Sequence, residues 1–313
     1  MLEVNIRMKN NNKTNAYFAA VLYAFIIGFS FLFTKMALTV DDPLNILAHR
    51  FTISFFTLLI PVLFGWIKLK ITARDVLSII PLSLFYPTLF FAFQVFGLVY
   101  VSSSEAGIIQ ATVPVFTMIL ATLFLKENIN LLQKVSLGAS VCGVIYIFIM
   151  KGIHLKSASF LGIVLIMLSA LSAACYNVIA KKITRKYKVV EVTYVMTAIG
   201  FLSFNALSAA DHIVKNTLIT YFKPFSSPVF LISIFYLGIL SSLITSLLSN
   251  YTLSKIEASK MSVFSNLSTL ITIFAGSIFL QEGIRYYHII GAIMIFLGIV
   301  GMNFSGRKRS INY

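Results

Sequence analysis

The sequence predicts an all-α integral membrane protein with ten transmembrane helices in two inverted five-helix repeats. Three observations predict this class: an apolar composition, apolar runs of helical length, and an internal repeat. Of the 313 residues, 58% are hydrophobic and only 11% are charged, and the mean hydropathy is +0.92. One soluble core has no room for so many apolar side chains. Apolar runs of about 20 residues recur, and an α-helix of that length crosses the hydrocarbon of a bilayer.

The internal repeat is clearest between residues 100–127 and residues 255–282. These segments align without a gap at an offset of 155 residues, and each closes on a Phe-Leu pair followed two residues later by a glutamate, Glu127 or Glu282. The same offset pairs Gly143 with Gly298, while an offset of 146 residues pairs positions nearer the N-terminus. Repeats of this length define the fold of the chain that carries them. The chain therefore divides into residues 1–152 and residues 153–313.

Ten helices follow in order, separated by connections that contain proline or charged residues. In the first half, helices are predicted at residues 16–38, 44–67, 76–99, 104–125 and 131–150. In the second half, they are predicted at residues 160–181, 190–210, 229–251, 259–280 and 285–304. Five crossings in the first half place the second copy upside down, and inverted repeats of this kind are common in secondary transporters.

Lysine and arginine are distributed unevenly between the two sides of the membrane. With a cytoplasmic N-terminus, 18 of the 25 basic residues lie on the inner side and 7 on the outer side. Short cytoplasmic loops of membrane proteins carry such an excess. We therefore expect a multi-pass protein of the plasma membrane with both termini in the cytoplasm. The net charge of +15 orients the chain in the bilayer and does not indicate a nucleic-acid partner.

Several segments together resemble a known family. They are Gly28–Lys35, Pro43 with the Arg50-Phe51 pair, and the 100–127 block with its second copy. In this five-plus-five plan the chain is similar to the EamA family of the drug/metabolite transporter superfamily. The resemblance implies a first EamA-like repeat of helices 1–5 at residues 1–152 and a second of helices 6–10 at residues 153–313.

The predicted function is secondary transport by alternating access between the two inverted repeats. The resemblance implies export of a small organic metabolite, either amino-acid-like or drug-like. Uptake of a metabolite or cation is an alternative, and a non-transporting membrane interaction protein or sensor is another. A membrane enzyme is disfavoured because phosphate-binding, nucleophile-elbow and HExxH motifs are lacking. No cofactor or metal is predicted. The predicted partners are a small-molecule substrate and the lipid bilayer, and association into a homodimer is left open.

Polar side chains inside the apolar runs are the candidates for substrate binding, because ionisable residues at membrane depth are rare and polar groups there need partners. Arg50 follows the start of the second predicted helix and is placed to bind a substrate carboxylate. Snorkelling to the outer interface, or an ion pair with Asp41 or Asp42, is the alternative. The candidate substrate-binding residues are Arg50, Tyr86, Gln94, Gln110, Tyr176, Asn177, Ser242 and Asn266. For Gln110, Asn177 and Asn266, hydrogen bonding between helices is an equal alternative.

Two further features of the first half have structural interpretations. Glu105 opens the fourth predicted helix, where a carboxylate complements the helix dipole. Tyr86 and Pro87 are expected to interrupt the third helix, either as a simple kink or as a hinge beside a cavity. Glu127 and Glu282 are expected to act in turns and caps.

Overall fold

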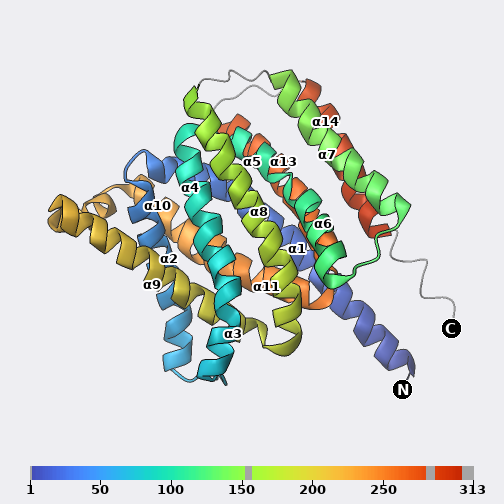
Figure 1. Ribbon diagram of the computed structural model, residues 1–313, viewed down its shortest axis with the longest axis horizontal. Coiled ribbons are helices and arrows are strands. Elements are labelled where there is room, and N and C mark those ends of the chain that lie inside the picture. Colours follow the sequence, from blue (N-terminus) through green and yellow to red (C-terminus); the bar gives the residue numbers. More distant parts are fainter. Residues whose placement is uncertain (1, 152–156, 280–285, 305–313) are drawn as a thin grey trace.

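The computed structural model describes residues 2–151, 157–279 and 286–304, and within these ranges every regular element is a helix (Figure 1). The first half comprises α1 (Leu2–Leu38), α2 (Pro43–Leu63), α3 (Ala73–Ser83), η1 (Leu84–Leu89), α4 (Phe90–Tyr100), α5 (Ser103–Gln110), α6 (Val113–Leu125) and α7 (Leu131–Lys151). The second half comprises α8 (Ser157–Lys186), α9 (Val189–Lys215), η2 (Leu218–Thr220), η3 (Lys223–Ser226), α10 (Pro228–Phe235), η4 (Tyr236–Ile244), α11 (Thr245–Lys255), α12 (Ala258–Ser262), α13 (Phe264–Phe279) and α14 (Tyr286–Phe304).

Eight helical segments of the described chain are long and apolar enough to cross a membrane. They are Lys13–Leu38, Pro43–Leu63, Ala73–Tyr100, Ser103–Leu125, Phe160–Lys186, Val189–Lys215, Pro228–Lys255 and Ala258–Phe279. These segments match eight of the ten predicted helices. α7 and α14 are helical at the other two positions, and their crossing of the membrane stays a prediction. The predicted boundary between residues 152 and 153, like Glu282, lies outside the described residues.

Four of the predicted helices are divided into shorter pieces. The third becomes α3, η1 and α4, and the eighth becomes α10, η4 and α11. The predicted interruption at Tyr86 is confirmed, since its backbone angles of φ −145° and ψ 115° are extended within an otherwise helical segment. The fourth and ninth helices each begin with a short helix, α5 or α12, before α6 or α13.

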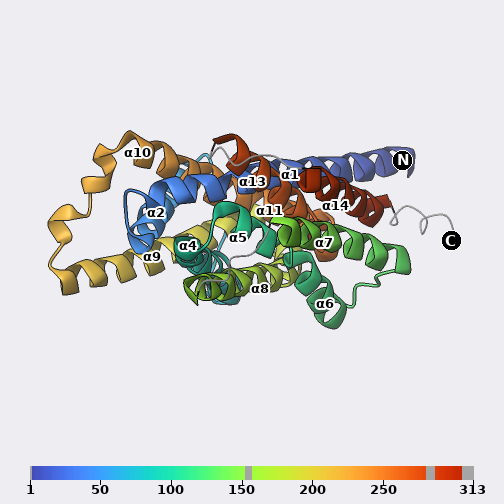
Figure 2. The same cartoon turned by 90° about the horizontal axis from the view of Figure 1, so that it is seen from above.

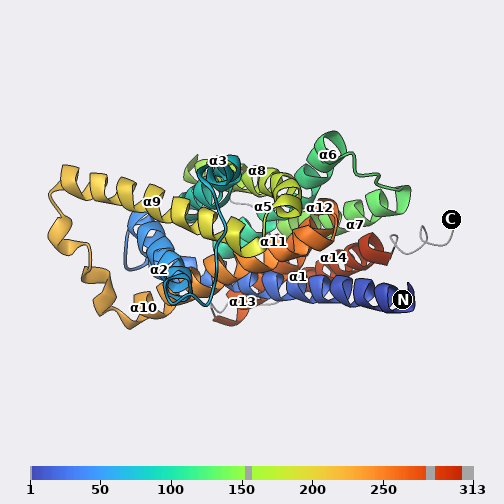
Figure 3. The same cartoon turned by 90° about the horizontal axis from the view of Figure 1, so that it is seen from below.

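The two halves pack against each other through equivalent helices. α1 contacts α11 and α13, while its counterpart α8 contacts α4 and α6, which are the counterparts of α11 and α13. α2 packs on α9, and α7 packs on α14 at one edge of the molecule (Figure 1). Helices at equivalent positions thus contact equivalent helices of the opposite half. A pseudo-twofold relation between the halves produces this pattern. The start of α1 and the end of α14 lie at the same end of the molecule, opposite the connection between α9 and α10 (Figures 2 and 3).

Aromatic packing fills the centre between the halves. The Phe51 ring lies between those of Phe91 and Phe204, with ring centroids 5.4 and 5.1 Å away. α9 approaches this cluster closely at Gly200, where a Cβ atom would lie 2.6 Å from the Phe51 ring and 2.9 Å from Pro87. Large apolar side chains such as Phe18 and Leu63 instead remain exposed on the outside. So much exposed apolar surface suits a protein surrounded by lipid.

Glu105 lies in the first turn of a helix, as expected, and it also caps that helix. Its carboxylate accepts a hydrogen bond from the Ser102 amide at 2.7 Å, and the Ser102 hydroxyl accepts one from the Glu105 amide at 3.2 Å. This reciprocal pair is a capping box at the start of α5. The carboxylate of Glu105 is therefore engaged at a helix end.

Candidate functional site

Arg50 lies in α2 with its side chain fully buried. Its Nε donates a hydrogen bond to the Ser242 hydroxyl at 2.6 Å, and its Nη2 donates one to the Ser241 hydroxyl at 2.8 Å. Both serines belong to η4 in the second half of the chain. The side chain thus neither snorkels outward nor pairs with Asp41 or Asp42. Arg50 instead connects the two halves at the centre of the molecule.

The backbone geometry of η4 supports this contact. η4 consists of widened, π-type helical turns, which are frequent at functional sites because they free backbone groups from the regular ladder. The Ser241 carbonyl accepts a hydrogen bond from Arg50 Nη2 at 3.3 Å. The 155-residue offset places Ser241 at the position of Tyr86, so both halves interrupt their third helix at the same place.

The positive charge of Arg50 has no counter-charge nearby. No carboxylate in the described part of the chain forms an ion pair with it, and Nη1 is buried without a hydrogen-bond partner there. The guanidinium carbon lies 3.9 Å from the centre of the Phe91 ring, where the ring face attracts a cation. This contact compensates only part of the cost of burying a charge. The environment of Arg50 therefore suits an anionic group.

Two tyrosines lie between α8 and the interrupted third helix. The Tyr86 and Tyr176 rings are stacked with their centroids 4.6 Å apart. The Tyr176 hydroxyl donates a hydrogen bond to Asn250 Oδ1 at 2.9 Å. The buried Tyr86 hydroxyl faces Thr245 and Ser246 without a hydrogen bond of good geometry to any described residue. A stack of aromatic rings thus lies beside a buried hydroxyl whose neighbours are the polar residues Thr245 and Ser246.

A small cavity adjoins these tyrosines. It is lined by Tyr23, Ile27, Phe31, Phe90, Gly107, Gln110, Val113, Ala173, Ser265, Ser268 and Thr269. Its volume of about 20 Å³ is enough for about one water molecule. Phe90 connects it to Tyr86, whose ring centroid is 4.9 Å away. A cavity of this size is too small for an organic solute.

The predicted candidates fall into a central group and a set of helix contacts. Arg50, Ser242, Tyr86 and Tyr176 lie in the centre, and Gln110 lines the cavity while donating a hydrogen bond to Ser169 at 3.0 Å.

The other three candidates lie elsewhere. Asn177 donates to the Thr117 hydroxyl at 3.3 Å, and Asn266 donates to the Ser140 hydroxyl. These two amides join α8 to α6 and α13 to α7, which agrees with the alternative of interhelical hydrogen bonding. Gln94 is buried in α4.

Three residues of the centre were not predicted from the sequence. Tyr236 lies close to Arg50 and donates a hydrogen bond from its hydroxyl to the Ile26 carbonyl at 2.8 Å. Phe91 lies under the guanidinium, and Tyr23 lines the cavity. Phenylalanine and tyrosine are abundant along the whole chain, so residue type alone did not distinguish these three positions from other aromatic residues. Ser241, by contrast, is a polar residue at the same depth as Ser242 and was expected as a pocket candidate on that ground.

Fold and site together define a multi-pass helical membrane protein built from two similar halves, with a buried polar centre between them. The sequence profile of the EamA-like transporter family matches residues 14–149 and 160–304, which are the two halves. The chain therefore belongs to the EamA-like transporter family, within the drug/metabolite transporter superfamily.

Relatives of similar length agree with this assignment. The chain is 54% identical to the "Uncharacterized transporter YcxC" of Bacillus subtilis, covering 97% of both chains. It is 28% identical to an "Uncharacterized transporter" of Archaeoglobus fulgidus, covering 87% of this chain and 92% of that one. A solved crystal structure has the same fold, with a TM-score of 0.73 at 16% identity over 95% of this chain and 99% of the other.

Proposed function

We propose that this protein exports a small organic solute with a carboxylate or similar anionic group, by alternating access of its two halves. The observation that carries the proposal is Arg50, a buried cation between the halves without a counter-charge in the described chain. A buried charge of this kind is costly, and a bound anion compensates it. Ionisable residues at membrane depth most often mark such pathways.

The contacts suggest how binding and movement are linked. Arg50 in α2 now donates to Ser241 and Ser242, which close the centre from the other half. A substrate carboxylate would bind Nη1 first, because that nitrogen has no partner to give up. The stacked Tyr86 and Tyr176 rings would cover the organic part of the solute. Separation of the halves on one side, then on the other, would release it.

The first experiment compares cells that lack the protein with cells that overproduce wild-type protein or Arg50→Met. Untargeted mass spectrometry of medium and cell extract measures which metabolites leave the cell. We expect a small set of carboxylate-bearing metabolites to accumulate in the medium with wild type. Loss of a buried charge partner costs about 2–5 kcal/mol, so export by Arg50→Met should fall at least about tenfold.

The control is Arg74→Gln, which removes an exposed arginine from α3 in the same half. Methionine at position 50 fills a similar volume without charge, and such replacements of buried charges are often neutral or stabilising. Membrane abundance of all variants is therefore expected to match, which immunoblotting checks. Equal export by wild type and Arg50→Met would remove Arg50 from the site.

Uptake and sensing remain the alternative functions and make different predictions. If the medium of overproducing cells becomes depleted of a metabolite, a labelled form of that metabolite should enter the cells faster. If no metabolite changes in either direction under several growth conditions, a non-transporting role is favoured over export.

A further inference from the structure

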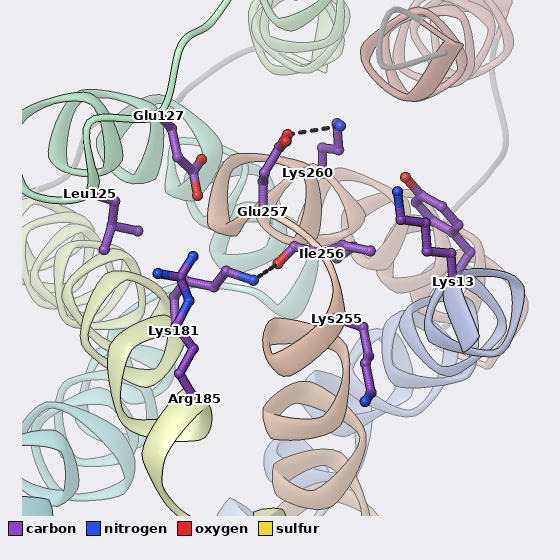
Figure 4. A pocket seen from close by; sticks show the side chains of 10 residues that line it. Lys13, Leu125, Glu127, Lys181, Arg185, Lys255, Ile256, Glu257 and Lys260 are labelled. Atoms are coloured by element: carbon purple, nitrogen blue, oxygen red, sulfur yellow. Dashed lines mark hydrogen bonds and ion pairs between the residues drawn. The ribbon is translucent and has the colours of Figure 1, made fainter. Parts of the chain in front are cut away.

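A second cavity lies at the opposite side of the fold from the α9–α10 connection, where α1 approaches the ends of α6, α8 and α11 and the start of α12 (Figure 4). Its volume is about 180 Å³. It is lined by Lys13, Tyr17, Leu125, Glu127, Lys181, Arg185, Lys255, Ile256, Glu257 and Lys260. We call this the basic pocket. Five of its side chains are cationic and two are carboxylates, and none belongs to the Arg50 centre.

Both carboxylates of the basic pocket already have partners. Glu127 Oε1 accepts a hydrogen bond from the Ala258 amide at 2.9 Å, and Oε2 accepts one from the Ser259 hydroxyl at 2.6 Å. This caps the first turn of α12, which agrees with the capping role expected for Glu127. Glu257 forms an ion pair with Lys260 at 2.8 Å. The partners of Glu127 are neutral groups, so its negative charge stays in the basic pocket and offsets one cation, while Glu257 offsets Lys260.

Lys181 is also engaged, with backbone carbonyls. Its ammonium donates to the Leu253 carbonyl at 2.8 Å and to the Ile256 carbonyl at 2.5 Å, at the end of α11. A cation at a helix C-terminus complements the partial negative charge of the unpaired carbonyls. Lys13, Arg185 and Lys255 remain, and none forms an ion pair with another described residue. Three uncompensated cations therefore line one cavity.

We propose that the basic pocket binds a phosphate group, attracted by the net positive charge to which Lys13, Arg185 and Lys255 contribute. These three exposed side chains extend from different sides of the pocket, so they would turn inward to contact a bound phosphate (Figure 4). A guanidinium binds phosphate through two parallel hydrogen bonds, and ammonium groups add charge. The phosphate could belong to an anionic phospholipid at the membrane surface or to a soluble phosphorylated solute, since both present the same group. Lys13 lies in the first half and the other two in the second, so a bound phosphate would tie the halves together as Glu127 does.

Inorganic phosphate is the first probe. Purified protein, depleted of lipid in a neutral detergent, is titrated with phosphate at constant ionic strength, and the thermal unfolding midpoint is measured. A ligand that binds only the folded protein stabilises it by RT ln(1 + L/Kd), where L is the phosphate concentration, so the midpoint rises once L exceeds the dissociation constant Kd. We expect Arg185→Gln/Lys255→Gln to need at least about tenfold more phosphate for the same shift, which corresponds to 1.4 kcal/mol. The matched control is Arg74→Gln/Lys182→Gln, which removes one arginine and one lysine, both exposed, from outside the basic pocket.

The second arm distinguishes the source of the phosphate. Wild type and both double variants are reconstituted in nanodiscs of phosphatidylglycerol or phosphatidylcholine, and the midpoint is measured again. A gain in phosphatidylglycerol that only the pocket variant loses assigns the basic pocket to a lipid headgroup. A response to inorganic phosphate without that gain assigns it to a soluble phosphorylated solute. No response to either probe, or equal losses in the pocket and control variants, would overturn the proposal.

Discussion

Arg50 shows how one residue makes two similar halves unequal. The offset of 146 residues pairs Arg50 with Met196, so only the first half places a cation in its second helix at this depth. Met196 lies against Asn250, with 3.5 Å between its sulfur and Nδ2. The charge at the centre therefore comes from one side, while the serines that bind it come from the other. An anion bound there would contact both halves.

Asp41 is a half-buried polar residue with an incomplete set of partners. Its Oδ1 accepts a hydrogen bond from Asn45 Nδ2 at 3.1 Å, while Oδ2 is buried without a partner among the described residues. Burial raises the pKa of the Asp41 carboxyl above its ordinary value of 3.8, although hydrogen bonds from Asn45 and Asp42 oppose that change. The charged form is therefore disfavoured in the folded protein.

This residue predicts a pH dependence of stability. The folded protein binds the Asp41 proton more tightly than the unfolded chain does. Its contribution to stability is therefore complete below pH 3.8 and is lost as the pH rises through the raised folded pKa. Asp41→Asn stays neutral throughout. We expect the thermal midpoint of wild type, relative to that of Asp41→Asn, to be higher near about pH 4 than near about pH 7. A difference between the two proteins that does not change with pH would contradict this.

At the scale of elements, α7 and α14 form a pair held by close backbone approach. A Cβ atom at Gly143 would lie 2.8 Å from the Gly291 carbonyl, and one at Gly298 would lie 2.5 Å from the Ser136 carbonyl. The 155-residue offset pairs these two glycines, so each half contributes a glycine at the equivalent position of the contact. Small residues permit this approach between transmembrane helices, where packing replaces the hydrophobic effect.

Gly298→Val is predicted to separate α14 from α7. The added side chain meets backbone atoms that cannot rotate away, and such overpacking costs about 1–3 kcal/mol. We expect a lower thermal midpoint for the purified variant in detergent. Gly138→Val in α7 is the matched control, because a Cβ atom there has nothing within 4 Å. Equal midpoints for the two variants would show that the α7–α14 contact does not depend on close approach.

At the scale of the whole molecule, the two packed halves place the first and last described helix ends on one side. The start of α1 and the end of α14 lie at one end, where the basic pocket also lies, and the α9–α10 connection lies at the other (Figures 2 and 3). Of the 25 basic residues, 18 were assigned to the side of the termini. From the positive-inside bias we predict that this side faces the cytoplasm.

This orientation is tested with two reporters. Green fluorescent protein fused after Tyr313 should fluoresce, because it folds in the cytoplasm. Alkaline phosphatase inserted after Asn216, in the α9–α10 connection, should be active, because it needs the oxidising outer compartment. A fusion at Tyr313 that does not fluoresce, or a phosphatase at Asn216 that is inactive, at normal membrane abundance, would contradict an arrangement with both termini inside.

The sequence by itself determined the class of protein, the two halves and most helix positions. Length and apolarity decide membrane spans because unpaired backbone groups are not tolerated in hydrocarbon, so each apolar run of sufficient length forms a helix. The 155-residue repeat indicated equivalent helices, and Pro87 indicated the break beside Tyr86. The sequence also indicated Arg50, because it is a charged residue within an apolar run. The start of α1 at Leu2, well before residue 16, was not predicted because polar residues carry no apolar signal.

Only the tertiary structure decided which polar residues meet. Ser242 lies 192 residues from Arg50, and no local pattern relates a serine on one helix to an arginine on another. Asn177 and Asn266, like Tyr86 and Gln110, are polar residues within apolar runs. In the structure, however, these two asparagines bind Thr117 and Ser140 on neighbouring helices and do not lie in the centre. The basic pocket likewise assembles from α1 and from the ends of four other helices. Periodicity specifies which face of a helix is polar, whereas the neighbour that this face meets depends on how the two halves pack.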